Sequence, residues 1–180
     1  MKSRPIALLT FALLAAAGTA LAAEPGGAPA APPLAATLLD GSHFTLAQSR
    51  GHVVLVNYWA SWCGPCRQEL PVFAAYYRAH HAEGFDVLAI NVDDSDTRAR
   101  ALEFAKTLPF PVALVAEVRT GDYARGCQPG GGLLSMVTPC LLPHSYILDR
   151  SGALVIDRRA GFDGTEFAAA IDPLLKPTAP

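Results

Sequence analysis

The stretch "VLVNYWASWCGPCRQELP", residues 54 to 71, decides the fold. It continues an apolar, β-branched run that begins at residue 52, and such a run is typical of a buried strand. From Pro65 to about His81 the spacing of apolar residues becomes helical. The stretch therefore predicts a strand that leads directly into a helix, with Cys63 and Cys66 at the turn between them.

The two cysteines stand two residues apart, which favours redox chemistry over a metal site or a structural crosslink. A zinc site usually needs four ligands, and the sequence contains no second pair at this spacing. At a helix N-terminus, free N–H groups and the helix dipole stabilise the thiolate of Cys63, and Cys66 lies one turn further on. Pro65 suits the first turn because its missing N–H would have no helical partner.

The residues on either side of this stretch predict an α/β fold. Asp40-Gly41 lies between two short apolar runs, which indicates an N-terminal hairpin. Further expected elements are a buried strand at residues 85–92, a helix from a cap at Asp94 or Ser95 to Lys106, a hairpin over residues 144–160, and a closing helix from Asp163 to Leu175. This order predicts a central sheet with helices on both faces.

The N-terminal segment predicts export from the cytoplasm. Two basic residues, an apolar run and a small-residue site at residues 20–22 are typical of a signal peptide over residues 1–22. The alternative is an uncleaved membrane anchor, in which case the protein would contact the membrane while facing the periplasm. Residues 23–33, rich in Pro, Gly and Ala, are expected to form a flexible linker, and residues 34–177 the folded domain of a periplasmic protein.

Charge limits the classes of partner. The net charge is −2 and the sequence has no run of lysine or arginine, which argues against nucleic-acid binding and a strongly basic membrane-binding surface. The hydrophobic content of 51% is inflated by the leader. Proteins or small molecules are the expected partners.

Two segments resemble a known family. Residues 54–71 resemble the active-site segment of the thioredoxin superfamily, in particular its TlpA and DsbE-like extracytoplasmic thiol-disulfide oxidoreductases, which are linked to cytochrome c maturation. The segment "LPHSYILDRSG", residues 142–152, is similar to the part of that family that runs from a cis-proline into a strand. The resemblance extends from about Leu34 to the end and implies a thioredoxin-like fold with a central mixed sheet. It also makes Pro143 the cis-proline, with Pro139 a poorer match.

The resemblance also implies roles for residues near the cysteines. Glu69 matches the glutamate of the pattern CxxCxxExP, which tunes or deprotonates the active-site thiols in this branch; the alternative is an exposed glutamate on the helix surface. Asn57 stands where thioredoxin has a buried aspartate, and it cannot accept a proton. The substrate-docking residues are expected to be Trp62, Gly64, Pro65 and Leu142. For Trp62 the alternative is a packed core aromatic.

Together these features predict a reductase of disulfides in partner proteins, acting for example in cytochrome c maturation or metallochaperone reduction, without a cofactor. Cys63 attacks the partner disulfide, and Cys66 resolves the mixed disulfide. The Gly-Pro dipeptide between them resembles that of thioredoxin, which favours electron donation. In an oxidising compartment the reductase must be recharged, and the family implies a membrane thiol transporter as donor.

A second cysteine pair, Cys127 and Cys140, lies in a glycine-rich insertion that departs from the family pattern. We expect a structural disulfide that closes a loop of about fourteen residues. The alternatives are a second redox pair that exchanges electrons with Cys63, and free thiols.

Two other activities are weighed against the reductase. A copper chaperone would use Cys63, Cys66 and His144, but copper-binding relatives of this fold place three residues between their cysteines. A thiol peroxidase would place a threonine two or three residues before its reactive cysteine, and the sequence from Tyr58 to Trp62 has none. No metal is expected as a resident cofactor. The acidic run at residues 93–97 reads as a helix cap and solvated turn.

Overall fold

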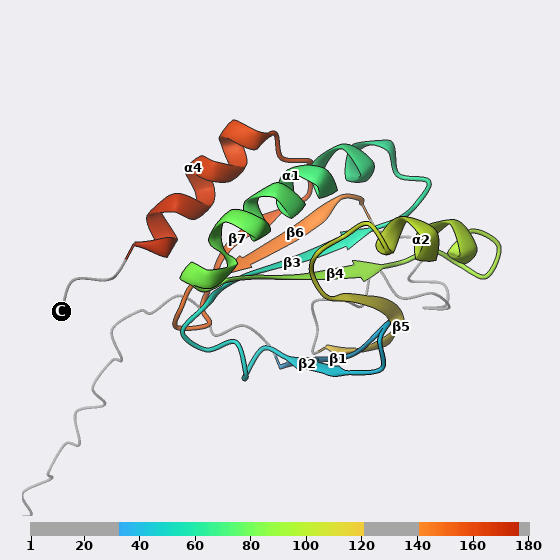
Figure 1. Cartoon of the computed structure of the whole chain (residues 1–180), viewed down its shortest axis with the longest axis horizontal. Coiled ribbons are helices and arrows are strands. Elements are labelled where there is room, and N and C mark those ends of the chain that lie inside the picture. The colour runs from blue at the N-terminus through green and yellow to red at the C-terminus, as the bar shows by residue number, and fades with distance from the viewer. Residues whose placement is uncertain (1–32, 121–140, 177–180) are drawn as a thin grey trace, which may run out of the picture.

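A computed structural model describes residues 33–120 and 141–176 of the 180-residue chain. The described residues form a seven-stranded sheet in the order β2-β1-β5-β4-β3-β6-β7, with helices packed against it (Figure 1). The strands are β1 (Leu34–Leu38), β2 (His43–Thr45), β3 (Val53–Trp59), β4 (Phe85–Asn91), β5 (Val112–Thr120), β6 (His144–Leu148) and β7 (Leu154–Arg158). The helices are α1 (Gly64–His80), the 3-10 turn η1 (His81–Glu83), α2 (Arg98–Ala105) and α4 (Gly164–Leu175).

The sheet is mixed, and β3 lies between strands of opposite direction. It pairs with β4 in parallel and with β6 in antiparallel, while β4 pairs with β5 in parallel. The two hairpins, β1–β2 and β6–β7, form its edges. The cysteines follow the carboxyl end of β3, and Pro143 precedes the start of β6. Because these two strand ends are paired, the segments that carry the predicted redox residues lie next to each other.

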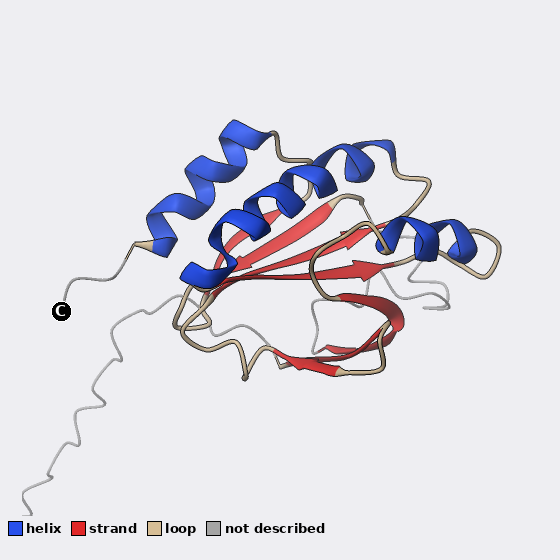
Figure 2. Ribbon diagram, in the orientation of Figure 1, coloured by secondary structure: helices blue, strands red, loops and turns tan. Residues whose placement is uncertain are grey.

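The two faces of the sheet bury separate apolar clusters. Leu55 and Trp59 of β3 belong to one cluster, and Val56 and Tyr58 to the other, as the alternation of side chains along a strand requires. The first cluster also includes residues of α1, α2 and α4, which lie on the same side of the sheet (Figure 2). The buried members of the second cluster all lie in strands. The sequence predicts helices on both faces of the sheet. Within the described residues, helices cover only one face.

Most elements lie where the sequence predicts them. The first hairpin turns at Gly41, whose φ of 83° suits glycine, and the second turns at Gly152 with a φ of 77°. Asp163 caps α4 by accepting a hydrogen bond from the N–H of Glu166 at 2.8 Å. The helix expected from Pro65 to about His81 is observed as α1, and β3 and β4 match the predicted strands within one residue.

Strand β5 is not among the elements predicted from the sequence. It pairs with β4 on one side and with β1 on the other, so it joins the N-terminal hairpin to the rest of the sheet. Val112 faces the helical side, whereas Ala113, Val115 and Val118 face the other side, so the buried positions do not follow a strict alternation. The pairing with β1 contains a register shift between Ala36 and Leu38. This irregularity weakens the period-two signal that identifies a strand.

Several sequence predictions fall outside the described residues. The signal peptide, the linker except for Pro33, and the pair Cys127 and Cys140 all lie there. Across residues 33–120 and 141–176, the structure contains no helix with the length and apolar character needed to cross a membrane.

Candidate redox site

A disulfide joins Cys63 and Cys66 at the start of α1, with an S–S distance of 2.03 Å. Cys63 is the N-cap of the helix, and its Sγ accepts a hydrogen bond from the N–H of Cys66 at 3.2 Å. Cys63 is 6% exposed and Cys66 is fully buried. Both cysteines are therefore buried in the oxidised state, and Cys63 is the more accessible of the two.

Glu69 lies one turn after Cys66 and is only 1% exposed, so the alternative of a surface glutamate is wrong. Its Oε1 accepts a hydrogen bond from Asn57 Nδ2 at 2.8 Å, and its Oε2 accepts one from the N–H of Phe162 at 3.2 Å. Burial raises the pKa of the Glu69 carboxyl to about 7, although both hydrogen bonds and the charge of Arg158 lower it. A carboxyl with this pKa can both accept and donate a proton near neutral pH.

Asn57 connects Glu69 to the strand that follows the cis-proline. It is fully buried on β3, and its Nδ2 donates to Ser145 Oγ of β6 at 3.0 Å as well as to Glu69. Its Oδ1 is buried without a hydrogen-bond partner. The same amide group therefore fixes the carboxyl of Glu69 relative to the opening residues of β6.

The peptide bond between Leu142 and Pro143 is cis, as the family resemblance implies. Pro143 lies close to Gly161, because a Cβ atom added at Gly161 would be 3.8 Å from Pro143 Cγ. The same atom would be 3.7 Å from Glu69 Oε2 and 4.0 Å from Pro65 Cβ. Gly161 is thus the point at which the cysteine motif, Glu69 and the cis-proline meet.

Asp93 anchors the loop before the cysteines, a role that no local sequence pattern indicates. It is 2% exposed, and its carboxylate accepts hydrogen bonds from the N–H of Ser61 at 2.7 Å, from Ser61 Oγ at 2.5 Å and from Asn91 Nδ2 at 2.7 Å. Burial would raise the pKa of Asp93, but the hydrogen bonds from Ser61, Thr97 and Asn91 together outweigh burial and hold the pKa below its usual range. The interpretation of residues 93–97 as a solvated turn is therefore wrong for Asp93. Asp94 is solvated as predicted, and its exposed carboxylate accepts from the N–H groups of Asp96 and Thr97. The predicted cap at Asp94 or Ser95 is wrong, because α2 begins at Arg98 with Thr97 as its N-cap.

We expect Asp93→Ala to lower the free energy of unfolding by about 1–3 kcal/mol, because the buried donors of Ser61 and Asn91 lose their acceptor. Denaturant titration of the oxidised protein measures this change. The matched control is Asp96→Ala, an exposed residue of the same run that should change stability by less than about 0.5 kcal/mol. Equal losses in the two variants would show that Asp93 has no anchoring role.

The expected docking residues differ in exposure. Trp62 is 56% exposed next to Cys63, so the alternative of a packed core aromatic is wrong. Leu142 is partly buried and packs against both apolar clusters. Gly64 and Pro65 form the first turn of α1. An exposed indole and an exposed leucine, Leu141 at 57%, leave apolar surface available beside the disulfide and the cis-proline.

His144 does not join the cysteines. Its ring packs among Tyr58 and Tyr146, with ring centroids 6.3 Å and 4.3 Å away, in the apolar cluster on the face opposite to Cys63 and Cys66. His144 Nε2 lies 2.7 Å from Asp157 Oδ1. Within the described ranges no group of three or more His, Cys, Asp and Glu side chains could hold a metal ion. The copper set proposed as an alternative is therefore not assembled.

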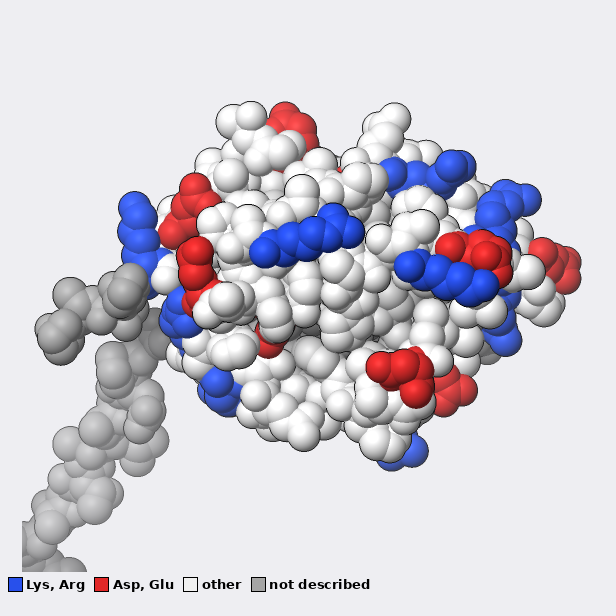
Figure 3. All heavy atoms as spheres, viewed as in Figure 1, with Lys and Arg blue, Asp and Glu red and all other residues white. Residues whose placement is uncertain are grey.

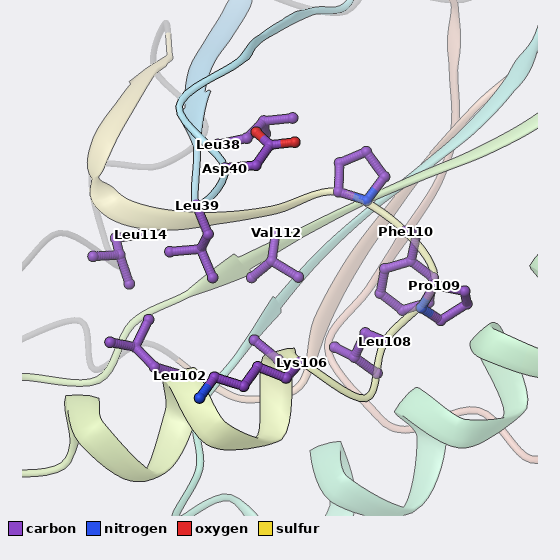
Figure 4. A pocket seen from close by; sticks show the side chains of 12 residues that line it. Leu38, Leu39, Asp40, Leu102, Lys106, Leu108, Pro109, Phe110, Val112 and Leu114 are labelled. Atoms are coloured by element: carbon purple, nitrogen blue, oxygen red, sulfur yellow. The ribbon is translucent and has the colours of Figure 1, made fainter.

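A separate pocket lies at the C-terminal end of α2. Its volume is about 780 Å³, and Figure 4 shows that its lining comes from the β1–β2 turn, the end of α2 and the residues leading into β5. Leu39, Leu102 and Phe110 point toward it, with Lys106 and Asp40 at its edge. Neither Cys63 nor Cys66 is among the described residues that line it. It is therefore distinct from the redox site.

Comparison with known proteins agrees with this geometry. The chain is 26% identical over 125 residues to the thiol-disulfide oxidoreductase ResA of Bacillus thuringiensis subsp. konkukian, covering 69% of this chain and 65% of ResA. It is 30% identical over 127 residues to the thioredoxin-like protein YneN of Bacillus subtilis, covering 69% of this chain and 66% of YneN. The chain thus spans slightly less than two thirds of the length of these curated relatives.

A solved structure shows the same fold. It is a candidate thiol:disulfide interchange protein DsbE from Chlorobium tepidum, 27% identical, with a TM-score of 0.62 over 83% of this chain and 97% of that one. The predicted thioredoxin-like fold is thereby confirmed. A profile of the AhpC/TSA family matches residues 28–155, which is more than half of the chain. The matched range includes Cys63, Cys66, Glu69 and Pro143. The chain therefore belongs to the AhpC/TSA family of thioredoxin-like proteins.

Proposed function

We propose that this protein is a thiol-disulfide oxidoreductase that reduces disulfides in partner proteins. The observation that carries the proposal is the Cys63–Cys66 disulfide at the N-terminus of α1, with the buried carboxyl of Glu69 one turn further on. Similarity to ResA, itself a thiol-disulfide oxidoreductase, supports the same activity.

The reaction begins with both cysteines reduced. The thiolate of Cys63 attacks one sulfur of the partner disulfide, which forms a mixed disulfide and releases the other partner sulfur as a thiolate. Cys66 then loses its proton and attacks the sulfur of Cys63. This second step forms the Cys63–Cys66 disulfide and releases the second partner thiolate, so that two electrons pass from the protein to the partner.

The helix start favours the first step. Cys63 caps α1, and the N–H of Cys66 already points at its sulfur in the oxidised state. When the disulfide is reduced, this N–H and the helix dipole stabilise negative charge on Cys63. Cys63 is also the more exposed cysteine, whereas Cys66 is fully buried, which supports Cys63 as the nucleophile and Cys66 as the resolving cysteine.

Glu69 supports the second step. A thiol buried as deeply as Cys66 does not lose its proton readily to water, because burial disfavours the thiolate. Glu69 lies on the same face of α1 three residues later, and its pKa of about 7 allows it to take this proton at neutral pH. Asn57 cannot perform this task, since an amide does not accept a proton, but it fixes the orientation of the carboxyl.

The partner surface and the location are proposed on the same basis. Trp62, Leu142 and Pro143 form the docking surface beside Cys63, together with Gly64 and Pro65. Acidic and basic side chains are interspersed on the face shown in Figure 3. Because Trp62 is exposed next to Cys63, we expect apolar contact to select the partner at the docking surface. The leader at residues 1–22 supports a periplasmic location, with a membrane thiol transporter as electron donor and cytochrome c maturation as one process served. Cys127 and Cys140 are proposed to form a structural disulfide.

The activity is tested by mixing the reduced protein with a peptide that contains one disulfide. We expect the peptide to gain two thiols for each Cys63–Cys66 disulfide formed. Peroxide consumption without peptide reduction would instead assign a thiol peroxidase and contradict the proposal.

Glu69→Gln should remove a pH dependence centred near pH 7 from the step that resolves the mixed disulfide. In the wild type this rate should rise with pH through about 7, as the Glu69 carboxylate becomes available to accept the proton of Cys66. Stopped-flow measurement of partner release in a single turnover isolates this step. The matched control is Glu103→Gln on α2, whose exposed side chain pairs with Lys106. An unchanged profile in Glu69→Gln would contradict the proposed proton transfer.

The same substitution should alter the dependence of stability on pH. Because the folded-state pKa of Glu69 is raised, the folded protein binds the proton more tightly than the unfolded chain does. The contribution of Glu69 to stability should therefore be largest below the ordinary glutamate pKa and should decline as pH rises toward about 7, by at most about 1.4 kcal/mol per pH unit. Glu69→Gln should lack this decline in denaturant titrations across the same range.

A further inference from the structure

We propose that Arg158 is a positioning residue that holds the loop of residues 159–162 closed over Glu69, so that the carboxyl exchanges its proton with Cys66 rather than with bulk water. The inference deepens the proposed function and rests on it. It is carried by the contacts of Arg158, which the reaction itself does not use.

Arg158 ends β7 and folds back onto the loop that follows it. Its Nη2 donates to the carbonyl oxygen of Gly161 at 2.9 Å, and its Nε donates to the same oxygen at 3.2 Å and to that of Ala160 at 3.3 Å. Nη2 also pairs with Glu166 Oε2 on α4 at 2.8 Å. One guanidinium therefore ties the loop to both of the elements that flank it.

The hold on Gly161 is transmitted directly to Glu69. The carbonyl of Gly161 and the N–H of Phe162 belong to one peptide unit, and in a trans peptide these two groups point in opposite directions. Arg158 binds the carbonyl, and Glu69 Oε2 accepts the N–H at 3.2 Å. Fixing the carbonyl toward Arg158 thus fixes the N–H toward Glu69.

The side chain of Phe162 provides a second contact. Its ring lies under the guanidinium, with Arg158 Cζ 4.4 Å from the ring centroid, and it packs against Phe73 and Phe167 in the core. Phe162 is 7% exposed. The loop is therefore held by the ring on one side and by its backbone on the other, and Gly161 lies against Glu69.

The planar guanidinium is suited to this task. It directs donors from Nε and Nη2 along one edge in fixed geometry, and its face stacks on an aromatic ring. A lysine ammonium would keep the positive charge, but it cannot span the two carbonyls and Glu166 while stacking on Phe162. Arg158→Lys therefore separates the positioning role from a simple charge effect.

The two explanations predict opposite effects on Glu69. Among the described residues, three groups change the pKa of Glu69: Asn57 from β3, the N–H of Phe162 and the charge of Arg158. Arg158 is itself paired with Glu166. The cysteines of α1 titrate only when they are reduced. As a nearby charge Arg158 lowers the pKa of Glu69, so removing only that charge would raise the pKa. Opening the loop would lose the hydrogen bond from Phe162, which lowers the pKa, but it would also admit water and remove the burial that raises the pKa most strongly, so the pKa would fall.

The test is an NMR titration of the Glu69 carboxyl in the oxidised protein labelled with ¹³C-glutamate, the Glu69→Gln variant identifying the resonance. We expect the pKa of Glu69 to fall by about one unit or more in both Arg158→Gln and Arg158→Lys, because both lose the fork of hydrogen bonds. Arg159→Gln, at an exposed neighbour of equal charge, should leave the pKa unchanged. If the Arg158 variants do not fold, Phe162→Leu tests the inference, because it removes the ring under the guanidinium without changing any charge. The pKa should fall by less than in the Arg158 variants, whereas a charge effect alone predicts no change.

Two results would overturn the inference: a pKa in Arg158→Lys equal to that of the wild type, or a raised pKa in Arg158→Gln. Either would leave Arg158 as a charge near the site. Because the titration uses the oxidised protein and needs no turnover, its result is independent of the activity. Failure of the wild type to reduce a peptide disulfide would refute the proposed function, whereas a normal pKa in the variants would refute only the role of Arg158.

Discussion

Cys63→Ser should reduce turnover of a peptide disulfide to the uncatalysed rate, because the serine hydroxyl cannot attack a disulfide under these conditions. Cys66→Ser should behave differently. Its Cys63 is still at the helix start and can attack once, but no thiol resolves the product, so we expect one partner thiol released per protein and then no further turnover. The measurement is thiol release with time from the pre-reduced protein without external dithiol, since a dithiol would itself release the peptide from the mixed disulfide.

The contrast between these two variants is the informative result. Both remove one sulfur from the same buried disulfide, so they serve as controls for each other in stability. Equal loss of the first thiol-releasing step in both would mean that the two cysteines have no distinct roles. Retained turnover in Cys63→Ser would place the nucleophile elsewhere.

Phe167→Ala should lower the free energy of unfolding by about 3–5 kcal/mol, the cost of truncating a buried aromatic and leaving a cavity. Phe167 is fully buried on α4, and its ring centroid lies 4.6 Å from that of Phe73, 5.2 Å from that of Tyr76 and 5.4 Å from that of Phe162. It thereby joins α4 to α1 and to the loop that covers Glu69. Denaturant unfolding with the disulfide intact measures the change.

The control for this prediction lies on the same helix. Thr165→Ala changes an exposed position two residues earlier and should alter stability by less than about 0.5 kcal/mol. A loss below about 1 kcal/mol in Phe167→Ala would show that α4 contributes little to the core.

The sequence predicts the parts of this protein that depend on local pattern. The strand before the motif, the start of α1 near Pro65, and the turns at Gly41 and Gly152 each follow from residues that are close together in the chain. The cis bond at Pro143 has no local signal strong enough by itself, and it was predicted from the family resemblance.

The remaining parts of the site depend on contacts between distant residues. Glu69 receives its second hydrogen bond from Phe162, 93 positions later, and Ser61 is held by Asp93, 32 positions later. The helical spacing places Glu69 on the face of Cys66, but it does not show that β7 and its loop cover that face. A strand with an irregular pattern such as β5 gives an equally weak local signal. These features are visible only once the chain is folded.

The most direct test of the proposed mechanism is to identify the cysteine that forms the mixed disulfide. Reduced Cys66→Ser is mixed with a peptide that contains a disulfide, quenched with acid, digested without reductant and examined by mass spectrometry. The mechanism predicts that the peptide is attached to Cys63. Attachment to Cys127 or Cys140 with Cys63 unmodified would contradict it, and would assign the attacking thiol to the second cysteine pair.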